Sequence, residues 1–129
     1  MPPFTQKSQV PEKHTGVTRI IKAGGYSLQR LKSTWISEAA FRQECLLALL
    51  LIPALLYFDL SSLQRIMLIT STVLVLIIEL LNSSIEAVVD RIGIEYHELS
   101  GKAKDIGSAA VLLSLALWAY IWLEVLLLQ

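Results

Sequence analysis

Residues 66–90 have the sequence IMLITSTVLVLIIELLNSSIEAVVD, and this stretch decides the fold of the chain. The 13 residues from Ile66 to Ile78 carry no charge, and the apolar pattern continues past Glu79 as far as Val89. A long apolar run of this kind is typical of a helix that crosses a lipid bilayer. The stretch therefore predicts a membrane-spanning helix over about residues 66–89.

Two more apolar segments lie on either side of this one. Residues 38–58 would form a helix roughly 31 Å long at about 1.5 Å per residue, which is enough to cross the hydrocarbon. Residues 106–123 are 18 uncharged residues in a row, and they predict a third span over about 106–126. The fold class that follows is an all-α membrane protein with three transmembrane helices.

The overall composition agrees with this class and excludes others. The chain has 129 residues, of which 54% are hydrophobic and 17% are charged, whereas soluble domains carry about 25% charged residues. The 11 basic and 11 acidic residues cancel, which argues against a broad nucleic-acid surface. The single cysteine, Cys45, excludes an internal disulfide framework.

The segment before the first span has a different pattern. Apolar residues recur at helical spacing over about 17–37, with basic residues between them, and this predicts an amphipathic helix at the membrane surface. The pair Gly24-Gly25 is expected to divide it into two short helices. Residues 1–14 are polar and rich in proline, and they are predicted to form a flexible leader, so that residues 15–129 make up a single membrane-embedded domain.

The basic residues predict the orientation of the chain. If the N-terminus is cytoplasmic, ten of the 11 Lys and Arg residues lie inside and only Arg65 lies outside. Cytoplasmic loops carry an excess of Lys and Arg. We therefore expect the surface helix and the polar stretch 90–105 to face the cytoplasm and the C-terminus to lie outside.

The second span carries polar residues that a simple membrane anchor would not have. Spacings of three, four, seven and eleven place Asn82, Ser83, Glu86 and Asp90 on the same helical stripe as Glu79, each within about 60° of it. Glu79 would lie about 20 Å into a hydrocarbon layer of about 30 Å. Because a charge at such depth costs about 2.5–3.5 kcal/mol on insertion scales, the stripe predicts a function.

Two carboxylates from different helices suggest a metal site. Glu38 begins the first span at a depth similar to that of Glu86, and together they could hold Mg²⁺, which typically takes one or two carboxylates plus phosphate oxygens. The alternative is that Glu38 forms only a charge pair with Arg42 at the start of the helix. Two carboxylates alone do not decide between these interpretations.

The stretch 90–105 is expected to be a long polar connector beside the inner ends of the spans. Its lysines, Lys102 and Lys104, could neutralise phosphates, although an ordinary solvated connector has the same composition. Two glycine-rich phosphate-binding motifs, G-x-x-x-x-G-K-[ST] and G-x-G-x-x-G, are both absent from the sequence. A nucleotide would therefore be bound without either motif.

Several stretches resemble the bacterial integral-membrane diacylglycerol kinases. They are ELLNSSIEAVVDRIG at 79–93, EYHELSGKAKDIGSAA at 95–110, TGVTRIIKA at 15–23 and EAAFRQE at 38–44. The resemblance implies a bundle of three spans and a surface helix per chain, assembled as a homotrimer with shared active sites in the bacterial inner membrane. It also implies transfer of the γ-phosphoryl group of Mg²⁺-bound ATP to diacylglycerol.

The resemblance also implies roles for individual residues. Glu79 matches the catalytic base, Glu38 and Glu86 match the metal-holding pair, and Asn82 matches a residue that supports the site. The positions that match contacts to ATP are Arg19, Tyr26, Glu38, Glu86, Glu95, Tyr96, His97, Lys104 and Asp105. Those that match contacts to the lipid substrate are Arg19, Ala23, Trp35, Ala40, Glu44, Glu79 and Ser108.

The residues alone leave other functions open. An intramembrane glutamate such as Glu79 would also suit a small proton-coupled transporter, and the polar stripe could join helices in a non-catalytic assembly subunit. A related branch of the family phosphorylates undecaprenol. The carboxylate pair and the adjacent lysine-containing stretch favour the kinase, because phosphoryl transfer needs positioning, charge neutralisation and a proton acceptor.

Overall fold

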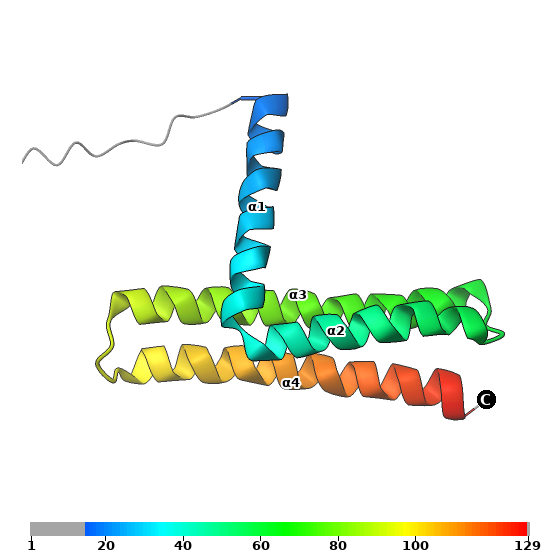
Figure 1. Ribbon diagram of the computed structural model, residues 1–129. Coiled ribbons are helices and arrows are strands. Elements are labelled where there is room, and N and C mark those ends of the chain that lie inside the picture. The colour runs from blue at the N-terminus through cyan, green and yellow to red at the C-terminus, as the bar shows by residue number, and fades with distance from the viewer. Residues whose placement is uncertain (1–14, 129) are drawn as a thin grey trace, which may run out of the picture. The chain divides into compact units, whose positions relative to one another are not determined.

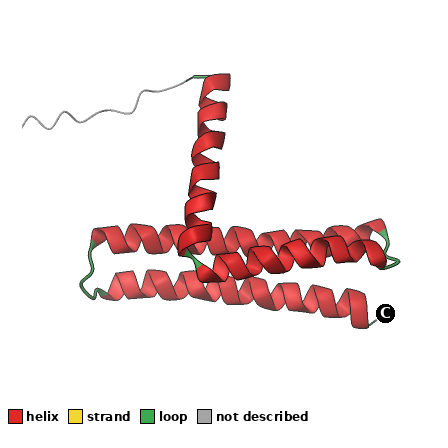
Figure 2. Ribbon diagram, in the orientation of Figure 1, coloured by secondary structure: helices red, strands yellow, loops and turns green. Residues whose placement is uncertain are grey.

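The computed structural model describes residues 15–128, and these residues form helices without any strand. The elements are α1 (Val17–Ser37), α2 (Ala39–Ala54), the short 3₁₀ turn η1 (Leu55–Tyr57), α3 (Ser62–Ile92) and α4 (Glu98–Leu127), shown in Figures 1 and 2. They divide into two compact units, of which the first ends at Ser37 and the second begins at Glu38. The predicted leader, 1–14, lies outside the described residues.

α1 is one continuous helix, so the predicted break at Gly24-Gly25 is wrong. Two glycines cost a helix only about 1 kcal/mol each relative to alanine. The hydrogen bonds of the turns on both sides continue through the pair and outweigh this cost. None of the residues of α1 is buried.

The second unit is a bundle of α2, α3 and α4 (Figure 1), in which α3 packs along α4 more extensively than along α2. Three helices are long and apolar enough to cross a membrane: Ala39–Tyr57, Ser62–Ile92 and Glu98–Leu127. The prediction of three apolar spans is confirmed. α3 would be about 46 Å long at about 1.5 Å per residue, which exceeds a hydrocarbon core of about 30 Å.

The connection between the second and third spans is shorter than the sequence predicts. α3 continues to Ile92 and α4 begins at Glu98, so only residues 93–97 lie outside helices, instead of the polar stretch 90–105. Charged residues are compatible with helical turns that extend beyond the hydrocarbon. His97 closes the start of α4, because its Nδ1 accepts a hydrogen bond of 3.1 Å from the backbone N–H of Leu99.

The start of α3 is fixed by a reciprocal pair of hydrogen bonds. The backbone N–H of Gln64 donates to Ser61 Oγ at 3.2 Å, and the backbone N–H of Ser61 donates to Gln64 Oε1 at 2.9 Å. This capping box satisfies two backbone donors that a helix start would otherwise leave unpaired. It therefore determines where α3 begins after the tight connection from η1.

Polar side chains within the spans mostly bond to their own helix. The hydroxyls of Ser71 and Thr72 donate to the carbonyl oxygen of Leu68, and the hydroxyl of Ser114 donates to that of Val111. Trp118 on α4 makes a bond between helices, since its Nε1 donates to Thr72 Oγ1 on α3 at 3.0 Å. This bond joins α3 to α4 about a third of the way along α3 from its start.

We expect the Trp118–Thr72 bond to contribute about 0.6 kcal/mol to stability, the average for hydrogen bonds between membrane helices. Thr72→Val, Trp118→Phe and the double variant form a cycle, measured by reversible unfolding in mixed micelles. The loss in the double variant should be smaller than the sum of the two single losses by about this amount. Additive losses would contradict the bond. Ser114→Ala, which removes only a bond within α4, is the control.

Candidate active site

The polar stripe of α3 faces the interior of the bundle over part of its length. Glu79 is 7% exposed and Asn82 is 9% exposed, whereas Leu81, Ser84 and Val88 on the opposite face are exposed. The burial of a carboxylate and an amide on a membrane helix is costly unless they have a function or partners. The stripe is thus a candidate site.

Glu79 lies among other carboxylates. Its charge interacts with those of Glu38, the residue immediately before α2, and Glu86, two turns further along α3. α2 begins part-way along α3, as Figure 1 shows, and this start brings Glu38 to the stripe. The structure therefore brings together the three carboxylates that the sequence assigned to catalysis and metal binding.

Asn82 is held by Glu86. Its Nδ2 donates a hydrogen bond of 3.5 Å to Glu86 Oε1. Its Oδ1 is buried and has no hydrogen-bond partner among the described residues. The side chain thus orients one oxygen of Glu86 and directs its own oxygen toward α4.

A hollow of about 530 Å³ lies where α3 turns into α4. It is lined by the ends of both helices and by the connection between them, residues Val89, Asp90, Gly93, Ile94, Glu95, Tyr96, His97, Ser100, Gly101 and Lys104. Tyr96 is 90% exposed, which leaves its ring free to stack on a ligand. Four of the predicted ATP contacts therefore line one hollow: Glu95, Tyr96, His97 and Lys104.

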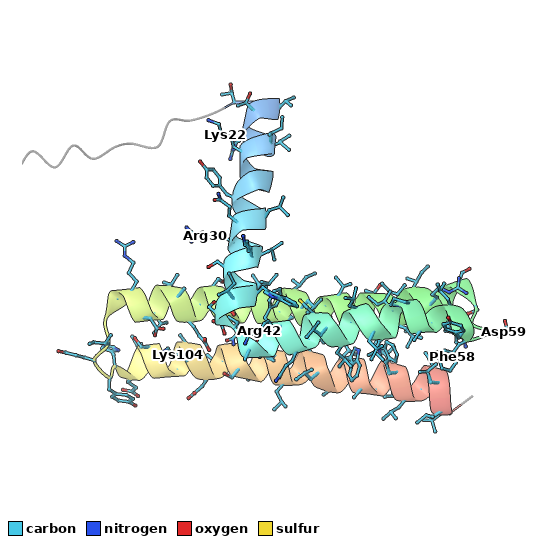
Figure 3. The ribbon with its side chains drawn as sticks, in the orientation of Figure 1. Lys22, Arg30, Arg42, Phe58, Asp59 and Lys104 are labelled. Atoms are coloured by element: carbon cyan, nitrogen blue, oxygen red, sulfur yellow. The ribbon has the colours of Figure 1, made fainter. Side chains whose placement is uncertain are left out.

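Lys104 connects this hollow to the carboxylates. Its Nζ lies 2.7 Å from Asp90 Oδ1 in an ion pair between α4 and α3, and its charge also interacts with that of Glu86. Figure 3 shows Lys104 in the first turns of α4, near the connection from α3. A cation here is in position to neutralise phosphate oxygens that approach Glu86.

The remaining predicted residues lie in other places. Glu44 on α2 has its Oε2 buried without a hydrogen-bond partner among the described residues, and it lines a largely apolar cavity of about 40 Å³ together with Thr72 and Trp118. Ala40 on α2 and Asp105 and Ser108 on α4 are exposed. Arg19, Ala23, Tyr26 and Trp35 all belong to α1, in the first unit.

The carboxylates of this site could hold Mg²⁺ only if oxygens from phosphate and water completed its coordination shell. Among residues 15–128 no group of three or more His, Cys, Asp or Glu side chains could hold a metal ion. Glu38 and Glu86 supply two carboxylates beside Glu79. Two carboxylates are the number that Mg²⁺ takes from a protein when phosphate oxygens and water complete its shell.

The roles of two residues of this site were not predicted from the sequence. Asp90 was predicted as part of the stripe, but its ion pair with Lys104 was not predicted. Gly107 was not assigned a role, although it is buried where α4 passes Asn82. The run of small residues 107–110 at the start of the third span was the available signal, because small residues let membrane helices approach closely.

Comparison with known proteins decides the family. The model of the prokaryotic diacylglycerol kinase family matches residues 25–126. The chain belongs to this family. It is 56% identical over 108 residues to diacylglycerol kinase of Escherichia coli strain K12, a match that covers 84% of this chain and 88% of the relative.

Two relatives from other bacteria are somewhat less similar to this chain. Diacylglycerol kinase of Haemophilus influenzae is 50% identical over 85% of this chain and 93% of its own length. Diacylglycerol kinase of Pseudomonas aeruginosa is 47% identical over 88% of this chain and 92% of its own length. The resemblance inferred from the motifs is confirmed, and with it the prediction of a bacterial membrane kinase over a transporter or an assembly subunit.

Charge reversals separate the two roles of Lys104. Lys104→Asp and Asp90→Lys each place like charges together, so each should lower the melting temperature, and the double reversal should restore it. Kinase activity should stay low in the double variant, because the cation then sits at position 90. Full recovery of activity would show that Lys104 acts only through the ion pair. Glu124→Lys, at the other end of α4, is the control.

Proposed function

We propose that the chain transfers the γ-phosphoryl group of ATP to the free hydroxyl of diacylglycerol and so makes phosphatidic acid. The family and the names of its relatives support this reaction. The observation that carries the assignment to a site is the buried Glu79 with Glu38 and Glu86 near it. The hollow that Lys104 helps to line lies further along α3, at its end. A transporter would need the glutamate but neither the paired carboxylates nor the hollow.

In this proposal Glu79 is the general base. The hydroxyl oxygen of the lipid forms a bond to the γ-phosphorus, the bond from that phosphorus to the bridging oxygen of ADP breaks, and Glu79 takes the hydroxyl proton. A carboxylate that is partly removed from water is a better proton acceptor than one in bulk water. Its depth suits a lipid whose hydroxyl lies close to the headgroup boundary.

The other residues hold and orient the nucleotide. The hollow at 89–104 receives it, with Tyr96 as a stacking surface and Lys104 as a cation for the phosphates. Glu38 and Glu86 would hold Mg²⁺, which neutralises phosphate charge when bound. Glu79 and Glu86 are seven residues apart, roughly 10 Å along the helix, and a metal ion with the γ-phosphate could bridge much of this separation.

The lipid side of the site is assigned by resemblance. Ala40, Glu44 and Ser108 are proposed to contact diacylglycerol, as are Arg19, Ala23 and Trp35 on α1. Tyr26 and Asp105 are proposed as further nucleotide contacts. We also propose that α1 is the amphipathic surface helix, since its basic and apolar residues alternate at helical spacing.

The proposed orientation places the hollow and α1 in the cytoplasm, where ATP is available. The distribution of Lys and Arg supports it, because Arg65 is the only basic residue at the end where α2 joins α3. Phe58 and Asp59 mark this opposite end in Figure 3. A cysteine introduced at Asp59 should then react with an impermeant maleimide added from the periplasm.

We further propose a homotrimer. The second unit exposes many large apolar side chains and covers the polar stripe only in part, which favours self-association within the bilayer. Light scattering of the purified protein in detergent should give a mass of three chains. A monomer that phosphorylates lipid at the full rate would contradict the trimer.

Lipid phosphorylation in mixed micelles tests the function. Radiolabelled ATP, Mg²⁺ and either diacylglycerol or undecaprenol are supplied to the full chain and to Glu79→Gln. We expect labelled phosphatidic acid from diacylglycerol, and a loss of about 10²–10⁴-fold in kcat in the variant, the range for removal of a general base.

The matched control is Glu124→Gln, which changes an exposed glutamate far from the stripe and should keep full activity. Phosphorylation of undecaprenol alone would assign the chain to the other branch of the family. A folded protein that phosphorylates neither lipid would contradict the proposed function.

A further inference from the structure

Gly107 is the point of closest approach between α4 and the polar stripe. A Cβ atom built at this position would overlap Oδ1 of Asn82 and would lie 3.4 Å from its Cγ. The next neighbour, Ile85 Cδ1, is 3.9 Å away, an ordinary van der Waals contact. The space that a side chain at 107 would need is therefore taken by one group, the amide of Asn82.

The other glycines in the described part of the chain have no such neighbour. A Cβ at Gly101, also on α4, would meet its nearest atom, Tyr96 Cε2, at 3.8 Å, and positions 16, 24, 25 and 93 have nothing within 4 Å. Glycine in a helix interior costs about 1 kcal/mol relative to alanine. At position 107 there is a steric reason for glycine, because the amide of Asn82 occupies the space that a side chain would need.

The amide of Asn82 is held from two sides. Its oxygen lies against Gly107, where α4 offers no side chain, and its nitrogen donates to Glu86 Oε1. That hydrogen bond is 3.5 Å long, at the upper limit for such a bond. A small displacement of the amide would therefore break it and leave Glu86 without this donor.

Moving α4 away would disturb two contacts with α3. One turn before Gly107, Lys104 and Asp90 form an ion pair of 2.7 Å between the two helices. Further along the helix, Trp118 donates its hydrogen bond to Thr72. A side chain added at 107 would thus displace Asn82 rather than the helix.

We propose that Gly107 is a positioning residue of the active site, which acts through Asn82 to hold Glu86 in its productive orientation. This inference rests on the proposed function, because it assigns Glu86 to the nucleotide side of the reaction. It predicts that the size of the side chain at 107 controls turnover, although Gly107 has no functional group of its own.

The test is a double-variant cycle of Gly107→Ala and Asn82→Ala in the full chain, in mixed micelles. Each single variant should lower kcat/KM for Mg²⁺-bound ATP by about tenfold or more, the usual effect of removing a group that orients a ligand-holding side chain. Gly107→Ala should also lower the melting temperature. The control is Ala116→Val, which adds two methyl groups at an exposed position of α4 and should keep the activity.

The double variant distinguishes a positioning role from simple helix packing. Removal of the Asn82 amide makes room for the new methyl group, so the melting temperature should recover from that of Gly107→Ala. The activity should not recover, and it should equal that of Asn82→Ala within about twofold, because the two changes act on one interaction.

The proposal would be overturned by wild-type activity in Gly107→Ala, by independent losses that multiply in the double variant, or by a double variant that fails to fold. Recovery of both stability and activity would show that Gly107 serves packing alone, and would overturn it too. If the wild-type chain phosphorylated no lipid, the proposed function would fail. The recovery of the melting temperature would still test the contact between Gly107 and Asn82.

Discussion

The rest of this structure depends on the placement of ionisable groups inside a helix that crosses a bilayer. Glu79 and Asn82 lie within the apolar length of α3, where an uncovered charge or amide is costly. The bundle covers them with α4 and with the start of α2. In the proposed function, the helix that anchors the chain also carries its chemistry.

The different lengths of the helices determine which polar residues lie close together. α3 and α4 are longer than a bilayer is thick, so their joined ends extend the bundle beyond the hydrocarbon. Those extra turns carry Asp90 and Lys104 and enclose the hollow proposed for the nucleotide. α2 is shorter than α3 and α4, and it begins beside the middle of α3 rather than at its end. This offset brings Glu38 close to the stripe. In the proposed mechanism, the lipid and the water-soluble substrate meet on this face of α3.

Much of this arrangement was predictable from the sequence, because it follows from periodicity. The apolar runs predicted three spans, and the spacing of Glu79, Asn82 and Glu86 predicted one stripe. Features that depend on partners were not predictable. His97 gave no sign that it closes the start of α4, so residues 98–105 were assigned to a connector, and Gly24-Gly25 were given too much weight as helix breakers. The closeness of Gly107 to Asn82 depends on how two helices cross, which the order of residues along one helix does not reveal.

The central claim is that the buried carboxylate of Glu79 is where the lipid reacts. Labelling with dicyclohexylcarbodiimide, a hydrophobic reagent for carboxyl groups, tests it directly when the modified residues are mapped by mass spectrometry. Glu79 should be labelled in micelles without substrate and protected when diacylglycerol is added, while labelling of Glu124 should not change. Equal labelling of Glu79 with and without the lipid would contradict a reaction at this carboxylate.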